Sequence, residues 1–184
     1  MTETILPHDV PNAKADPAAN YSLLSVINHW LGVLAIIIMV AAQQLDLPSI
    51  HLSFGLLLAL PLIWRVIFRL SRGFPRTPNQ HPTISFLERL IIIGLLAAIF
   101  LLAITGLIMP LLSGTAYNFF NLVSWTAPYS GNQAALEITQ QVHLFCATAL
   151  LPLFLLHLAS FARHAIINKN GNTLRMLRPL NGGK

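Results

Sequence analysis

Two histidines, His143 and His157, lie in the last long apolar stretch of the chain, from Glu137 to Ile167. In a helix with 100° and 1.5 Å per residue, their spacing returns to within about 40° of the same face after a rise of about 21 Å. The hydrocarbon core of a bilayer is about 30 Å thick, so the two positions fall one in each leaflet. Neutral imidazole is an axial ligand of haem iron. This spacing therefore suits two haems stacked across a membrane, provided that other segments supply the partner ligands.

Two further histidines, His29 and His51, lie in the first two apolar stretches. His29 lies about 10 Å inside the first stretch, whereas His51 is near the start of the second. Asn28 and Trp30 flank His29, so an interfacial polar cluster is the alternative to a ligand at this position. Gly32, one turn beyond His29, removes a side chain where a flat macrocycle would need room.

Arg65 follows His51 by 14 residues and thus repeats the spacing found in the last stretch. A helix would place Arg65 below His51, near the opposite membrane surface. Its guanidinium could pair there with a haem propionate, or it could snorkel to the lipid headgroups. The sequence leaves both interpretations open. His164 follows His157 at the water boundary, and we expect it to be an interfacial residue or a propionate contact and not a ligand.

The composition of the chain predicts an integral membrane protein. Of its 184 residues, 55% are hydrophobic and 9% are charged, and the mean hydropathy is +0.66. Soluble proteins contain about a quarter charged residues. Long apolar stretches occupy about residues 22–43, 50–70, 86–112 and 137–167. We therefore expect an all-α four-helix bundle over residues 21–168, between a mobile N-terminal tail (1–20) and a basic C-terminal tail (169–184).

The cysteine content restricts the type of haem. Cys146 is the single cysteine of the chain, and no Cys-x-x-Cys-His sequence is present. A disulfide within the chain is therefore excluded, as is covalent haem attachment through that motif. The sequence predicts b-type haem, held by ligation and packing alone.

The connections between the apolar stretches differ in composition. Residues 43–49 form a short connection with one proline, which predicts a tight turn. Residues 71–86 are rich in proline and basic residues, which predicts a loop with a solvated His81. Residues 113–138 are rich in aromatic side chains, which is typical of an interfacial segment. This segment could contain a short amphipathic helix on the membrane or form a lid over a haem edge.

The cations indicate the orientation of the chain. In a four-helix arrangement all eleven Lys and Arg residues flank one side, and none lies in the connections 43–49 and 113–137. The positive-inside rule then places both termini and the middle loop in the cytoplasm. The same cations account for the basic isoelectric point, so the positive net charge is a sign of how the chain is oriented in the membrane. The sequence contains no motif for binding nucleic acid.

This orientation allows the depths of the four histidines to be compared. His29 and His157 fall in the cytoplasmic half of the membrane, whereas His51 and His143 fall near the outer surface. Ionisable side chains at such depths are costly and usually functional. Two depth-matched pairs are what bis-histidine ligation of two haems requires, and four separate structural histidines are the alternative.

The order and spacing of these motifs resemble those of the bacterial cytochrome b561 family. The shared features include the His-Trp pair at His29 and the His-x3-Gly sequence at His51, which Arg65 and Arg69 follow. They also include the two histidines of the last helix and the tail sequence from Asn172 to Met176. The resemblance extends over residues 21–179.

The resemblance implies a four-helix cytochrome of the bacterial inner membrane with two b-type haems. It implies an oxidoreductase whose partners are membrane lipid, ubiquinone or another quinone, and a redox partner protein. Some members oxidise superoxide at the outer face and pass the electron to ubiquinone. Related domains are cytochrome subunits of hydrogenases and other dehydrogenases, so the alternative function is that of a cytochrome b subunit or anchor of such an enzyme. Carried over residue by residue, the resemblance places the haem ligands at His29, His51, His143 and His157.

The outer connections of this chain depart from the superoxide-oxidising pattern. They contain Asp46 and Glu137 and neither Lys nor Arg. A small anion is normally gathered by a positive field, so superoxide is expected to be a poor substrate. A non-redox membrane protein, such as a histidine-lined metal transporter, is the alternative from another class. Transporters tend to have inverted repeats or broken helices, and neither is visible in the sequence.

Overall fold

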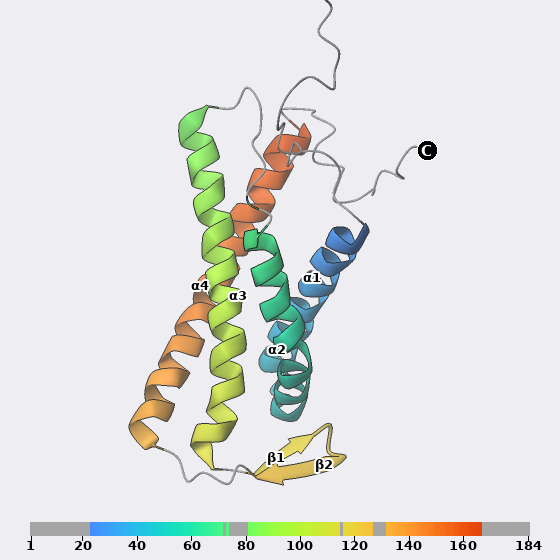
Figure 1. The fold of residues 1–184 in the computed structure, drawn as a ribbon, viewed down its shortest axis with the longest axis vertical. Helices are drawn as coiled ribbons and strands as arrows, with labels where there is room; N and C mark the ends of the chain where they lie inside the picture. Colours follow the sequence, from blue (N-terminus) through green and yellow to red (C-terminus); the bar gives the residue numbers. More distant parts are fainter. Residues whose placement is uncertain (1–22, 72, 74–80, 115, 127–131, 167–184) are drawn as a thin grey trace, which may run out of the picture.

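The computed structural model describes residues 23–71, 73, 81–114, 116–126 and 132–166. These residues form four long helices and one short two-stranded hairpin (Figure 1). The two tails expected from the sequence, residues 1–20 and 169–184, lie outside the described part of the chain.

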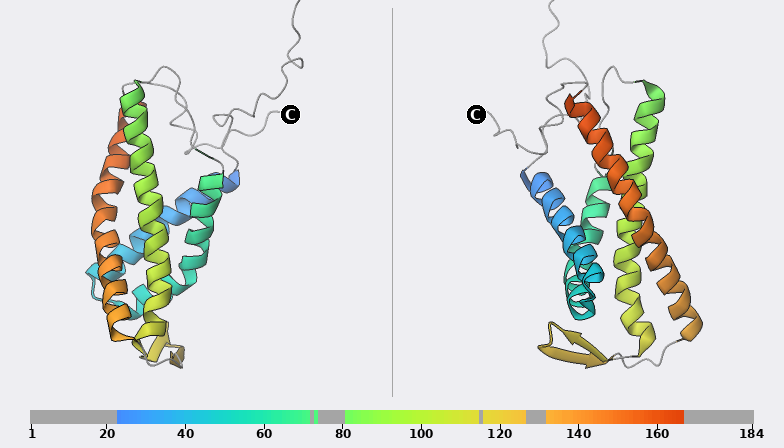
Figure 2. Two further views of the ribbon diagram at one scale, coloured as in Figure 1. Left: turned by 60° about the vertical axis from the view of Figure 1, so that its left-hand side comes forward. Right: turned by 180° about the vertical axis from the view of Figure 1, so that it is seen from behind.

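All four helices are long and apolar enough to cross a membrane. Successive helices run in opposite directions, so the ends of α2 and α4 lie on the same side as the beginnings of α1 and α3 (Figures 1 and 2). We call this side the arginine end, because Arg69, Arg89 and Arg163 lie near it. The opposite side is called the hairpin end. The helices are α1 (Leu23–Gln44), α2 (Pro48–Ser71), α3 (Pro82–Ser113) and α4 (Gln133–Ile166).

A tight turn joins α1 to α2, as the sequence predicts. The amide of Leu45 donates to the carbonyl of Ala41 over 2.9 Å, and the amide of Leu47 donates to the carbonyl of Ala42 over 2.9 Å. Asp46 has a φ of 52°, in the left-handed region that short polar side chains tolerate. Pro48 then begins α2, at a position where the missing amide proton costs nothing.

Two helices begin about four residues earlier than the apolar pattern predicts. His81 caps α3, because its Nδ1 accepts a hydrogen bond from the Thr83 amide over 3.4 Å, and Pro82 follows at the first helical position. Asn132 caps α4 through its Oδ1, which accepts from the Ala135 amide over 3.2 Å. Capping residues of this kind set helix starts independently of hydrophobicity. His81 itself is exposed, in agreement with the sequence.

The connection between α3 and α4 contains a β-hairpin in place of the short amphipathic helix considered from the sequence. Strand β1 (Ala116–Phe119) pairs antiparallel with β2 (Val123–Thr126), and Tyr117 lies opposite Trp125. Aromatic and β-branched residues favour strands, and the turn residues Phe120 and Asn121 adopt left-handed φ angles of 48° and 58°. The helical alternative is therefore wrong for residues 116–126.

The hairpin is attached to α2 through a fully buried serine. Ser53 Oγ donates to the carbonyl of Ser49 over 2.6 Å and accepts from the Phe120 amide over 2.7 Å. The rings of Phe54 and Phe120 also meet edge to face, with their centres 5.1 Å apart. Because Ser53 lies two residues after His51, this attachment lies next to one of the candidate ligands.

Each helix packs mainly on its neighbours in sequence, and α3 packs most extensively on α4. Gly94 permits this approach, since a Cβ there would lie 3.3 Å from the Cδ2 atom of Leu153. A small buried cluster lies between α2, α3 and α4, whereas many large apolar side chains face outward, as expected for helices in lipid. The cluster consists of Val66, Leu96, Ala98, Ile99, Cys146 and Leu150.

Candidate functional site

The structure brings His51 of α2 and His143 of α4 together near the hairpin end. Their ring centres are 6.3 Å apart and their planes are inclined at 75°. Bonds from imidazole to a metal are about 2 Å long, and each ring centre lies about 1 Å from its Nε2 atom. Two imidazoles on opposite sides of one iron should therefore have ring centres about 6 Å apart. The observed separation of 6.3 Å is close to this value.

The backbone of α1 selects the tautomer of a neutral His51 ring. Its Nδ1 lies 3.0 Å from the carbonyl oxygen of Met39. A carbonyl can only accept a hydrogen bond, so Nδ1 carries the proton and Nε2 keeps its lone pair. Gly55 leaves room for the side chain of Met39, because a Cβ at Gly55 would lie 3.2 Å from the Met39 methyl carbon. The sequence pattern of His51 and Gly55 thus has a local structural reason.

A buried threonine of α3 has the same effect on His143. The Thr105 hydroxyl donates to the carbonyl of Leu101 over 2.6 Å, which uses its only proton. Its oxygen therefore accepts from Nδ1 of His143, over 2.8 Å. Nε2 of His143 is left as the unprotonated atom, as in His51. Histidines that bind metals usually donate their other ring proton to such an acceptor.

His29 of α1 has the opposite arrangement, because its partner is a cation. Arg65 of α2 donates from NH2 to Nδ1 of His29 over 2.8 Å and from NH1 to the carbonyl of Asn28 over 2.9 Å. A guanidinium is a donor only, so Nδ1 of His29 is an acceptor and a neutral ring carries its proton on Nε2. Gly32 accommodates Arg65, since a Cβ there would lie 2.9 Å from Arg65 Cδ. The space that the sequence assigned to a macrocycle therefore contains the arginine side chain.

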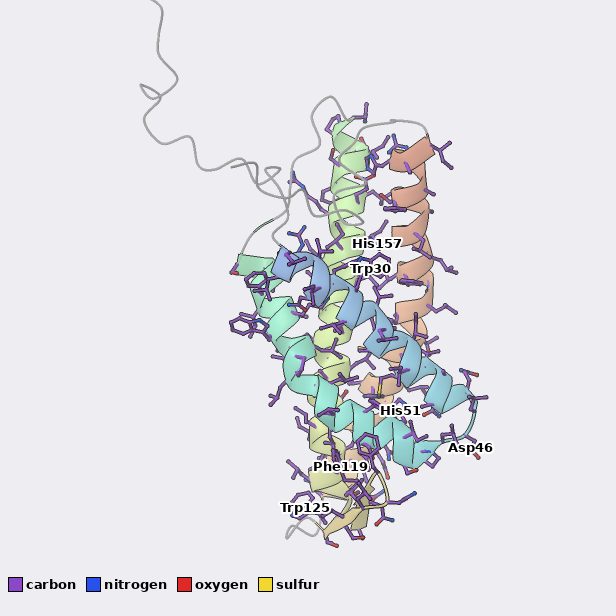
Figure 3. All side chains as sticks on the ribbon, turned by 90° about the vertical axis from the view of Figure 1, so that its right-hand side faces the viewer. Trp30, Asp46, His51, Phe119, Trp125 and His157 are labelled. Carbon is purple, nitrogen blue, oxygen red and sulfur yellow. The ribbon has the colours of Figure 1, made fainter. Side chains whose placement is uncertain are left out.

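His157 of α4 lies on the same side of the molecule as His29. Figure 3 places His157 close to the level of Trp30 and far from His51 along the long axis. Trp30 contacts the His29 ring edge to face, with the ring centres 5.8 Å apart. The histidines thus form two groups at two depths, as the spacing predicts.

A polar cluster that was not predicted from the sequence joins α3 to α4 at the arginine end. Glu88 Oε1 accepts from Ser160 Oγ over 2.9 Å and lies 2.8 Å from Nε2 of His164. Arg163 NH1 lies 3.5 Å from the same oxygen. His164 therefore has a carboxylate partner, and the interfacial position expected for it is consistent with this contact. A carboxylate inside the third apolar stretch was the available signal for this cluster.

Comparison with known proteins agrees with these features. The family described as prokaryotic cytochrome b561 matches residues 20–179 of the chain. The chain is also similar to cytochrome b561 homolog 2 of Escherichia coli (strain K12), with 24% identity over 170 residues. This alignment covers 85% of the present chain and 90% of the relative.

The family match spans all four helices and all four intramembrane histidines. It implies b-type haem and electron transfer in a membrane, which agrees with a pair of imidazoles at the spacing of axial ligands. The chain therefore belongs to the prokaryotic cytochrome b561 family.

Proposed function

We propose that this protein carries electrons across the bacterial inner membrane through two b-type haems and exchanges them with quinone. The observation that carries this proposal is the pairing of His51 with His143 at a ring separation of 6.3 Å. When bound, the haems supply the one-electron redox chemistry. The protein supplies ligation, spacing and tuning of the haem potentials.

The outer haem would be held by His51 and His143. Both rings already have the required tautomer, because the Met39 carbonyl and the Thr105 hydroxyl occupy their Nδ1 atoms. The residues at this position fit a bis-histidine haem without any change of protonation. Hydrogen bonds of this kind also make the ligand more basic, which stabilises the oxidised iron.

The inner haem would be held by His29 and His157. The residue types and their common depth fit such a site, but the Arg65 hydrogen bond occupies Nδ1 of His29. Ligation through Nε2 of His29 requires its proton to move to Nδ1, which in turn requires Arg65 to release that atom. A haem propionate is a stronger partner for a guanidinium than a neutral imidazole is. We therefore propose that Arg65 pairs with a propionate of the inner haem when the haem binds.

The distribution of charge supports an orientation with both termini in the cytoplasm. Among the described residues, Arg69, Arg89 and Arg163 lie toward the arginine end, whereas Asp46 and Glu137 lie toward the hairpin end. By the positive-inside rule the arginine end faces the cytoplasm. The inner haem would then lie in the cytoplasmic half and the outer haem in the opposite half of the bilayer.

A haem assay tests this proposal directly. Protein purified from cells with ample haem should show a b-type reduced-minus-oxidised spectrum and contain about two haems per chain by pyridine haemochrome analysis. Protein without b-type absorption would contradict the proposal. Protein with one haem, retained in a His29→Ala variant, would limit the function to the outer site.

A further inference from the structure

Glu88 and His164 form a partly buried acid and base pair outside both histidine groups. Nε2 of His164 lies 2.8 Å from Oε1 of Glu88, and each side chain is only 17% exposed. Two more α4 side chains converge on the same oxygen, Ser160 at 2.9 Å and Arg163 at 3.5 Å. A proton can reside on either member of such a pair while the hydrogen bond between them persists.

The pair lies near the membrane boundary at the arginine end. Glu88 is the seventh residue of α3, so it lies about 9 Å along the helix from Pro82. The 32 residues of α3 would span about 48 Å, longer than a hydrocarbon core of about 30 Å. Both ends of α3 therefore reach the headgroup region, where the pair can exchange protons with water.

The pair is also connected to the inner histidine group along one face of α4. Ser160 and His164 lie one and two turns beyond His157, so the three side chains share a face. The rise from His157 to His164 is about 10 Å. A titratable pair thus lies between the aqueous phase and the proposed inner haem.

Reduction of a quinone to a quinol consumes two electrons and two protons, but haems deliver only electrons. A proton donor is therefore required wherever a quinone is reduced. Among the described residues, Glu88 is the carboxylate toward the arginine end, since Asp46 and Glu137 lie toward the hairpin end. Within the part of the chain that the structure describes, the charged groups facing Glu88 are Arg163 and His164 of α4, and Arg89 adjoins it on α3.

We propose that Glu88 and His164 form a proton-transfer pair for a quinone that reacts at the inner haem. The two electrons would come from the bound haems in two one-electron steps, the pair would supply a proton for each, and water at the arginine end would replace that proton. The product is the quinol, and the same steps run backward when a quinol is oxidised. This inference rests on the proposed electron transfer between haem and quinone.

A Glu88 variant that keeps its hydrogen bonds but cannot carry a proton distinguishes the proton-transfer role from a structural one. In Glu88→Gln the amide oxygen still accepts from Ser160 and His164, but the side chain can no longer take up and release a proton. The full-length protein would be reduced with dithionite and mixed in a stopped-flow instrument with a short-chain ubiquinone. In a parallel run the acceptor would be ferricyanide, which takes an electron and no proton.

We expect haem oxidation by ubiquinone to be at least about 10-fold slower in Glu88→Gln, since positioned proton transfer typically contributes more than this. Oxidation by ferricyanide should not become slower. Thr148→Ala is the control, because it removes an exposed hydroxyl of the same helix 12 residues before Ser160, and its rates should match the wild type.

His164→Gln provides a second test if Glu88→Gln does not retain haem, and it should also slow the ubiquinone reaction selectively. Equal ubiquinone rates in wild type and variants would overturn the proton-transfer role and leave the proposed function intact. Equal slowing with ubiquinone and ferricyanide would also overturn it, in favour of a structural or purely electrostatic role. A wild type oxidised by ferricyanide but not by ubiquinone would reject quinone as partner, and the pair's role with it.

Discussion

The two histidine groups differ in what occupies their Nδ1 atoms. In the outer group, a carbonyl and a hydroxyl accept the Nδ1 protons of His51 and His143. In the inner group, Nδ1 of His29 accepts a hydrogen bond from Arg65. The polypeptide alone thus prepares the outer pair for a metal, whereas the inner pair is compatible with a haem only after Arg65 changes its partner. Pre-organised sites bind more tightly because less ordering is needed on binding.

Loss of a ligand should have the largest effect and tests the pairing itself. His51→Ala or His143→Ala should remove the outer haem and leave about half of the haem content, because a single imidazole holds haem weakly. His29→Ala or His157→Ala should remove the inner haem. Redox titration monitored by absorbance would identify which haem is lost. His81→Ala is the control, since this exposed residue lies outside the membrane helices and both haems should remain.

The pairing would be wrong if His29→Ala and His143→Ala depleted the same haem. That result would mean that His29 and His143 bind the same haem and do not lie at different depths.

Replacement of Arg65 should have the next largest effect, and only on the inner haem. Arg65→Leu should lower its midpoint potential, because the reduced, more negative state loses a nearby cation. A unit charge at about 10 Å in an effective dielectric constant of about 20 contributes about 1–2 kcal/mol. Arg65→Lys retains the charge and should shift the potential less. An unchanged inner potential in Arg65→Leu would favour simple snorkelling of this side chain.

Replacement of Thr105 should have a smaller effect, confined to the outer haem. Thr105→Val preserves the shape of the side chain but cannot accept the Nδ1 proton of His143, so the ligand becomes less basic and the outer potential should rise. One hydrogen bond contributes about 1 kcal/mol, which is a few tens of mV for a one-electron couple. Thr105→Ser restores the hydroxyl and should restore the potential. A rise in the inner potential instead would assign His143 to the other haem.

The smallest effect is expected from salt at the outer face. The connections at the hairpin end contain Asp46 and Glu137 but neither Lys nor Arg, so superoxide gains no long-range attraction there. Reduction of the haems by superoxide should be slow and nearly independent of ionic strength, whereas a neutral quinol should react. Stopped-flow traces with fast reduction that weakens strongly as salt is added would contradict this expectation.

The sequence was sufficient to predict the helices and the depths of their histidines, because both follow from apolar length and from the rise per residue. It placed His29 with His157 and His51 with His143 by depth, and the structure brings the second pair to the separation of axial ligands. The assignment of these residues as haem ligands stays a prediction.

Other features could not be predicted because they depend on how the helices rotate and cross. The contacts of Thr105 with His143 and of Arg65 with His29 join residues 38 and 36 positions apart. No periodicity within one helix indicates such a contact. The early start of α3 and the position of Glu88 were predictable, in contrast, because the His81-Pro82 cap and a lone carboxylate in an apolar stretch are visible in the sequence.

Because Gly32 and Arg65 are in close contact, the residue that is tolerated at one of these positions depends on the residue at the other. A methyl group at position 32 would lie 2.9 Å from Arg65 Cδ and Nε, so it would push the guanidinium away from His29 and Asn28. A larger residue at position 32 is therefore tolerable only where residue 65 is shorter or points elsewhere. Among homologues, the two positions should change together, and the pair would be recognisable as a covarying unit.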